Sequence, residues 1–82
     1  MERYIIFCKP TCPFCVSAVQ IMEQHNLNFK QVIFEQDQEA LLTEVKEAYE
    51  WRTVPMIFKR VEDTITFIGG YTDLLDHLEV DE

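Results

Sequence analysis

Residues 8–15 read Cys8-Lys9-Pro10-Thr11-Cys12-Pro13-Phe14-Cys15 and separate two segments of different periodicity. Residues 3–7 are β-branched and aromatic, whereas residues 16–23 carry apolar side chains at helical spacing. A strand is therefore predicted to run into a Cys-x-x-Cys motif that opens a helix. In this context the motif is typical of a dithiol redox site, although the bare tetrapeptide is also half of a zinc site.

The predicted nucleophile is Cys12, because it occupies the N-cap of the expected helix. Pro13 then falls at the first helical position, where its missing N–H costs nothing. The sulfur faces the N–H groups of Phe14 and Cys15 at the positive end of the helix dipole, which favours thiolate over thiol. Cys15 lies one turn further on, within disulfide reach of Cys12, and is predicted to be the less ionised, resolving thiol.

Three motifs, in the same order and at about the same spacing, make the chain similar to the dithiol glutaredoxins over nearly its whole length. They are Lys9 and Thr11 with Cys12-Pro13-Phe14-Cys15, then Arg52-Thr53-Val54-Pro55, and then Gly69-Gly70-Tyr71-Thr72-Asp73. The resemblance implies an α/β, thioredoxin-like (glutaredoxin) fold of order β-α-β-α-β-β-α, with a central four-stranded mixed sheet flanked by three helices. Two residues depart from the family pattern: Phe14 stands where Tyr is usual, and Cys8 where Ser is common.

The periodicity alone predicts elements in the same order. Strands are expected over residues 3–8, 28–34, 56–59 and about 64–68, and helices over residues 13–25, 37–50 and from 72. The first two strands should be parallel with a right-handed crossover, and the last two should form a hairpin across residues 61–63. Asp37 is the expected cap of the second helix, and residues 79–82 are expected to fray. The residues expected to face inward from the helices are Val16, Val19, Ile21, Met22, Leu41, Leu42, Val45, Ala48, Tyr49, Leu74, Leu75 and Leu78.

Length, apolar content and charge limit the class of protein. The 82 residues are long enough for one small domain, which the resemblance identifies as a single glutaredoxin domain over 1–82, expected to be monomeric. The protein is expected to be cytoplasmic, because no apolar run is long enough for a membrane span or a signal peptide. The net charge of −8 argues against nucleic-acid binding. The acidic residues gather after residue 34, where they either form a solvated face or steer the protein towards a basic partner.

Val54 and Pro55 lie at the entry to the third expected strand. The resemblance implies a cis bond between them, which would turn the N–H and C=O of Val54 towards Cys12 and a peptide substrate. From the residues alone, an ordinary trans proline at a strand edge is the simpler interpretation.

The resemblance also implies a glutathione site. Asp73 is expected to take the ammonium, the N–H groups of Thr72 and Asp73 the γ-glutamyl carboxylate, and Lys9 with Arg52 the glycine carboxylate. The alternative is that Gly69-Gly70 ends a strand, Asp73 favours a helix start, and the two cations are solvated. The implied binding residues are Lys9, Thr11, Phe14, Arg52, Thr53, Val54, Pro55, Gly70, Thr72 and Asp73.

Other residues that could carry chemistry have simpler explanations. Cys8 completes a C-x₃-C-x₂-C spacing also used by iron–sulfur clusters, but a small buried residue at a strand end is the favoured interpretation. No fourth zinc ligand is spaced near the cysteines, so no metal is expected. His25 and His77 are interpreted as surface residues at helix ends. Trp51 either packs on the core or borders the substrate groove.

The predicted function is that of a glutathione-dependent thiol–disulfide oxidoreductase, with Cys12 and Cys15 as the redox pair and glutathione as the cosubstrate. Its expected partners are glutathionylated or disulfide-containing proteins, among which the resemblance suggests ribonucleotide reductase. Two alternatives stay open. One is a redoxin of the same shape that is reduced by thioredoxin reductase; the other is a carrier in which two chains hold a [2Fe–2S] cluster through Cys12 and glutathione.

Overall fold

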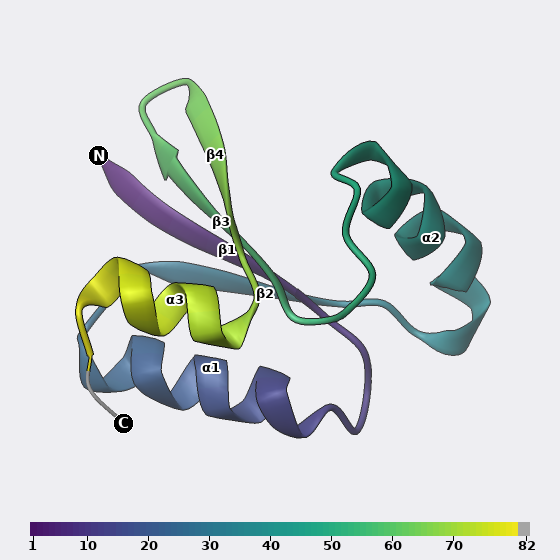
Figure 1. Cartoon of the computed structure of the whole chain (residues 1–82), viewed down its shortest axis with the longest axis horizontal. Helices are drawn as coiled ribbons and strands as arrows, with labels where there is room; N and C mark the ends of the chain where they lie inside the picture. Colours follow the sequence, from purple (N-terminus) through teal and green to yellow (C-terminus); the bar gives the residue numbers. More distant parts are fainter. Residues whose placement is uncertain (81–82) are drawn as a thin grey trace.

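The computed structural model describes residues 1–80, so the fraying predicted for Asp81 and Glu82 lies outside the described part. Its element order, β-α-β-α-β-β-α, confirms the thioredoxin-like fold (Figure 1). The elements are β1 (Glu2–Cys8), α1 (Pro13–Gln24), β2 (Phe29–Ile33), a short 3₁₀ helix (Gln36–Gln38), α2 (Glu39–Ala48), β3 (Met56–Val61), β4 (Thr64–Gly69) and α3 (Tyr71–Leu78).

The four strands form one mixed sheet in the order β2-β1-β3-β4. β1 and β2 are parallel, as predicted for strands joined by a crossover helix, and β3 is antiparallel to both β1 and β4. The register pairs Phe7 with Met56, so the end of β1 lies beside the start of β3. This pairing brings the loop that holds the cysteines and the segment that ends at Pro55 to the same edge of the sheet.

The two faces of the sheet carry separate cores. α1 and α3 lie side by side on one face, where Tyr4, Ile6 and Cys8 of β1 point towards them (Figure 1). Ile5 and Phe7 alternate with these residues and belong to the core beneath α2 on the opposite face. The alternation along β1 therefore assigns Cys8 to the same layer as the helix that begins at Cys12.

The buried face of α1 agrees with the prediction only in part, because Val16 was predicted to face the sheet whereas Cys15 and Ala18 were not. Cys15, Ala18 and Met22 are buried, at the spacing of a single helical stripe. Val16 is 56% exposed and does not face the sheet, because it lies about a quarter turn away from that stripe.

The start of the second helix was predicted wrongly. Asp37 does not cap α2 but lies within the preceding 3₁₀ helix, whose start is held by a hydrogen bond from the Glu35 N–H to Gln38 Oε1 of 3.1 Å. α2 itself begins at Glu39 and ends at Ala48, before the predicted end.

The apolar stripe predicted for α2 is also only partly correct. Leu42 is the buried residue of the helix, whereas Leu41 is 51% exposed and Ala48 is exposed. Tyr49 follows the helix and is 45% exposed, although its ring packs edge-on against Phe58 at 5.1 Å between centroids.

α3 begins one residue earlier than predicted, at Tyr71. Leu74 and Leu75 are buried as expected, and Leu78 packs against the same core. Across residues 1–80, none of the helices combines the length and the apolar character that a membrane span requires.

Candidate active site

Cys12 occupies the N-cap of α1, as predicted. Its backbone is extended (φ −105°, ψ 108°), and Pro13 takes the first helical position. The Cys15 N–H donates to Cys12 Sγ at 3.3 Å, so this sulfur satisfies one of the unpaired donors of the helix start. Of the two N–H groups expected at the sulfur, that of Cys15 makes the hydrogen bond. The side chain of Cys12 is half-buried.

Cys15 is the protected member of the pair, with 2% of its surface exposed. A hydrogen bond with Cys8, burial, and a hydrogen bond with Cys12 together raise the pKa of Cys15 above that of an ordinary thiol. Cys8, Cys12 and Cys15 are all free thiols in this structure. The burial and the raised pKa agree with the prediction that Cys15 is the less ionised thiol.

The Val54–Pro55 peptide bond is cis, as the family resemblance implied. Cys12 Sγ lies 3.8 Å from Val54 O, so the carbonyl of this segment faces the sulfur. Pro55 itself is buried at the start of β3. The segment therefore presents backbone polar groups beside the candidate nucleophile.

A groove of about 270 Å³ lies along this segment, between the starts of α1 and α3. Phe14, which is 62% exposed, and Tyr71 border it with ring centroids 6.0 Å apart. Cys12 does not line the groove itself, but its sulfur lies beside Val54, which does. A larger cavity of about 640 Å³ near His77 contains none of the cysteines. The residues that line the groove are Phe14, Trp51, Thr53, Val54, Pro55, Gly70, Tyr71, Thr72 and Asp73.

Asp73 holds the start of α3 in place. Its Oδ2 accepts a hydrogen bond of 2.9 Å from the Gly70 N–H, which gives the carboxylate the capping role that the sequence left open. Asp73 also lines the groove, and its role in binding the ammonium of glutathione stays a prediction. The N–H groups of Thr72 and Asp73 belong to the first turn of α3, where an α-helix offers no acceptor of its own.

We expect Gly69→Ala to destabilise the protein by about 1–3 kcal/mol. Gly69 has φ +127°, and a Cβ there would lie 2.5 Å from Asp73 Oδ2. The matched control is Gly70→Ala, whose Cβ would meet its nearest atom at 3.6 Å, at a cost of at most about 1 kcal/mol. Thermal unfolding of both variants measures the difference, and equal losses of Tm would contradict this account of Gly69.

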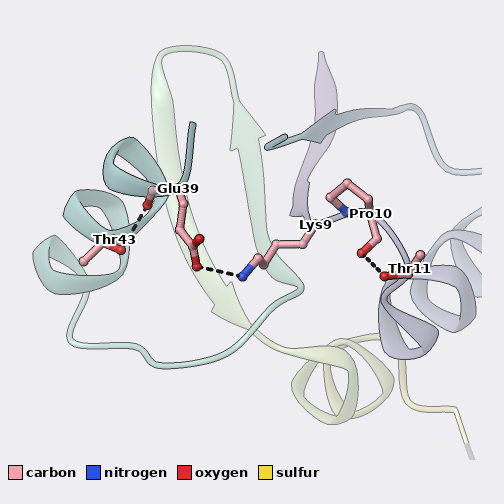
Figure 2. A network of polar contacts seen from close by, with 5 residues as sticks. All are labelled: Lys9, Pro10, Thr11, Glu39 and Thr43. Carbon is pink, nitrogen blue, oxygen red and sulfur yellow. Dashed lines mark hydrogen bonds and ion pairs between the residues drawn. The ribbon is translucent and has the colours of Figure 1, made fainter. Parts of the chain in front are cut away.

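Lys9 forms an ion pair with Glu39 of α2 and does not line the groove (Figure 2). Its Nζ lies 3.1 Å from Glu39 Oε1, while the Thr43 hydroxyl donates to the Glu39 backbone carbonyl at 3.0 Å. The Thr11 hydroxyl donates to the Pro10 carbonyl at 2.6 Å. Neither Lys9 nor Thr11 lines the groove. The predicted binding residues that do line it near the starts of α1 and α3 are Phe14, Gly70, Thr72 and Asp73.

Arg52 is exposed and also lies outside the groove lining, whereas its neighbour Trp51 lines the groove. The Trp51 ring packs edge-on against Phe67 at 5.2 Å, so it contacts both the core and the groove. Its Nε1 is buried without a hydrogen-bond partner among the described residues. Trp51 and Tyr71 line the groove but are not among the implied binding residues. The signal for both was an aromatic residue adjacent to or inside a motif.

Cys8, His25 and His77 agree with their simpler interpretations. Cys8 is fully buried at the end of β1, and Gln31 Nε2 donates to its sulfur at 3.7 Å. His25 ends α1, and His77 Nε2 lies 3.1 Å from the Tyr4 hydroxyl, away from Cys12. Within residues 1–80, no three His, Cys, Asp or Glu side chains are grouped as ligands of a metal ion.

Comparison with known proteins points to one family. A family model described as Glutaredoxin matches residues 4–62. The chain is 32% identical over 81 residues to Glutaredoxin-1 of Bos taurus, which covers 90% of this chain and 71% of that protein. It is 37% identical over 73 residues to the hybrid peroxiredoxin hyPrx5 of Haemophilus influenzae, covering 89% of this chain but only 28% of that protein. Glutaredoxin 1 from Francisella tularensis, solved in complex with cacodylate, superposes with a TM-score of 0.77 at 28% identity, over 96% of this chain and 94% of that chain.

Proposed function

The chain belongs to the glutaredoxin family, and from this premise we propose that it is a glutathione-dependent thiol–disulfide oxidoreductase. The observation that carries the proposal is the position of the Cys12 sulfur. It accepts the Cys15 N–H at the start of α1 and lies 3.8 Å from the Val54 carbonyl, at one side of the groove. A thiolate is stabilised at such a helix end, and a peptide can pair with the adjacent backbone.

The proposed reaction with a glutathionylated protein uses Cys12 alone. Its thiolate attacks the glutathione sulfur of the mixed disulfide, the protein thiolate leaves, and Cys12 becomes glutathionylated. A second glutathione thiolate then attacks the bound glutathione sulfur, which releases oxidised glutathione and restores Cys12. The hydrogen bond from the Cys15 N–H favours Cys12 as the leaving thiolate in this second step.

The proposed reaction with a protein disulfide uses both cysteines. Cys12 attacks one sulfur of the client and forms a mixed disulfide, with the second client sulfur leaving as a thiolate. Cys15 then attacks Cys12 Sγ, the reduced client leaves, and a Cys12–Cys15 disulfide remains for glutathione to reduce. The hydrogen bond of 3.3 Å from the Cys15 N–H to Cys12 Sγ supports this step, because it holds the Cys12 sulfur beside Cys15.

We propose that the groove holds the glutathione backbone beside Cys12. The Val54 carbonyl and N–H would pair with the cysteine residue of glutathione, and the first turn of α3 would receive the γ-glutamyl carboxylate at Thr72 and Asp73. Asp73 would hold the ammonium with the oxygen that does not cap α3. Lys9 and Arg52 would meet the glycine carboxylate, which requires Lys9 to leave Glu39.

Release of Lys9 is testable with Glu39→Gln, which we expect to lower the KM for glutathione roughly two- to fivefold. The exposed Lys9–Glu39 pair is worth at most about 1 kcal/mol, and removing it frees the Lys9 ammonium for the ligand carboxylate. Glu44→Gln is the control, since it makes the same charge change on α2 at a residue without an ion pair in the described structure. Equal effects of the two variants would rule out a specific role for Lys9.

The raised pKa of Cys15 predicts how the resolving step depends on pH. Because the pKa lies above that of an ordinary thiol, the attacking thiolate is a minor species at neutral pH. Its population, and with it the rate, should rise about tenfold per pH unit from neutral to at least about pH 8.5. Release of glutathione from the isolated Cys12–glutathione adduct, without added thiol, measures this rate. A plateau below about pH 8.5 would show that Cys15 is already ionised there.

The direct test of the proposed function is a coupled assay with a glutathionylated peptide. We expect turnover with glutathione, glutathione reductase and NADPH, and no turnover when thioredoxin reductase replaces the glutathione system. Reduction by thioredoxin reductase with no response to glutathione would overturn the proposal in favour of a redoxin. A protein disulfide assayed in parallel reports whether Cys15 takes part.

A further inference from the structure

The side chains of three cysteines lie beneath the start of α1, and that of Cys15 lies between those of Cys12 and Cys8. Cys15 hydrogen-bonds both Cys12, on its solvent side, and Cys8, on its buried side. Cys8 has no exposed surface and Cys15 has 2%, and both belong to the core between the sheet and α1. The resolving sulfur therefore has two sulfur neighbours, of which the proposed reaction uses only one.

The surroundings of Cys8 favour its ionised form more than those of Cys15. The hydrogen bond from Cys15 lowers the pKa of Cys8, and the Gln31 side-chain amide, whose Nε2 lies 3.7 Å away, lowers it further against the opposing effect of burial. The Gln31 hydrogen bond persists when Cys15 is in a disulfide and no longer has a proton to donate. Cys8 thus keeps one donor to its thiolate, although burial raises the pKa of Cys8 by more than this donor lowers it, so the exchange proceeds through a minor thiolate population.

We propose that Cys8 is a third redox-active thiol, which exchanges with the Cys12–Cys15 disulfide to give a buried Cys8–Cys15 disulfide and a free Cys12. The inference rests on the proposed function, because that reaction generates the Cys12–Cys15 disulfide. The geometry that carries it is that Cys8 and Cys15 are buried in one core cluster, that Cys12 packs against the same cluster, and that the Cys15 N–H donates to Cys12 Sγ at 3.3 Å.

The exchange balances without an added oxidant. The Cys8 thiol loses its proton to solvent, and the thiolate attacks Cys15 Sγ. The Cys8–Cys15 bond forms, the Cys12–Cys15 bond breaks, and the electron pair leaves on Cys12 Sγ. Cys12 is the better leaving group, because the N–H of Cys15 and the start of α1 stabilise its thiolate.

The consequence is a change of mechanism without a change of oxidation state. With Cys15 held by Cys8, Cys12 is free to turn over glutathionylated proteins, but the protein lacks a resolving thiol for protein disulfides. The buried disulfide is out of reach of glutathione, so it is removed only by the reverse exchange with Cys12.

Cys12→Ser provides the sharpest test, because Cys8 and Cys15 are then the only cysteines. The small oxidant diamide, which takes up the two hydrogen atoms itself, replaces oxidised glutathione because Cys8 and Cys15 are buried. It is added under conditions that form the Cys12–Cys15 disulfide in the unchanged chain, and the unfolded products are alkylated and weighed by mass spectrometry. We expect Cys12→Ser to lose two hydrogen atoms and to take up no alkyl group. The control, Cys8→Ser with Cys12→Ser, should keep one thiol that alkylates. Two alkyl groups on oxidised Cys12→Ser would overturn the inference.

A second measurement uses the unchanged chain. After oxidation, the folded protein is alkylated. Molecules with a Cys8–Cys15 disulfide should be labelled at Cys12. Molecules with a Cys12–Cys15 disulfide have only the buried Cys8 as a free thiol and should stay unlabelled. Cys8→Ala should lose that labelled fraction, and its presence there would contradict the exchange. Glutathione-dependent turnover, measured on the same samples, separates the two proposals. Turnover without a Cys8–Cys15 disulfide would overturn only the proposed role of Cys8. A Cys8–Cys15 disulfide without turnover would overturn only the proposed function.

Discussion

Cys12→Ser is expected to lower turnover of glutathionylated substrates and of protein disulfides by at least about three orders of magnitude. Both proposed reactions begin with attack by the Cys12 sulfur, and a hydroxyl in the same place is neither ionised nor a disulfide-forming atom. The variant should stay folded, because serine is a favoured N-cap residue and can accept the same Cys15 N–H. Steady-state rates with both classes of substrate measure the loss.

The loss should be chemical and not a failure to bind. Trp51 is the only tryptophan and lines the groove, so its fluorescence reports glutathione binding in both the variant and the unchanged chain. We expect the two titrations to give affinities within about threefold of each other, because the groove residues are unaltered. Residual turnover near the original rate would mean that another thiol is the nucleophile, and Cys12 would have to be reassigned.

The parts of the site that depend on local sequence were predicted well. Whether Cys12 caps α1 depends on Pro13 and the few residues that follow, so the cysteine motif was sufficient to predict it. The meeting of the Cys12 loop with Val54 depends on the pairing of β1 with β3, which no local pattern encodes. That part of the site came from the resemblance to a known family and not from periodicity.

The errors lie where long-range packing decides between locally equivalent choices. Leu41 and Leu42 are adjacent and equally apolar, so the sequence leaves open which of them faces the sheet, and the docking of α2 selects Leu42. The same docking places Glu39 beside Lys9, which lies thirty positions earlier in the sequence. The charge pattern showed an acidic helix and an isolated lysine, but not that the two would form an ion pair.

Cys15→Ser should separate the two proposed reactions. Turnover of glutathionylated substrates should stay within a few-fold of the original rate, because glutathione and not Cys15 releases the Cys12 adduct. Reduction of protein disulfides should fall by roughly two orders of magnitude or more, since the mixed disulfide with the client then waits for an external thiol. Substitution of one buried sulfur by oxygen leaves the hydroxyl close to Cys8 and Cys12, so the fold should persist.

The ratio of the two rates is the quantity to compare, because a general loss of stability would lower both and leave the ratio unchanged. Mass spectrometry should also find the mixed disulfide between Cys12 and the client accumulating in Cys15→Ser, whereas the unchanged chain forms the Cys12–Cys15 disulfide instead. Equal losses with both substrate classes, or reduction of protein disulfides at the original rate, would show that Cys15 is not the resolving thiol. A hydroxyl at position 15 thus distinguishes a dithiol enzyme from one in which Cys12 and glutathione suffice.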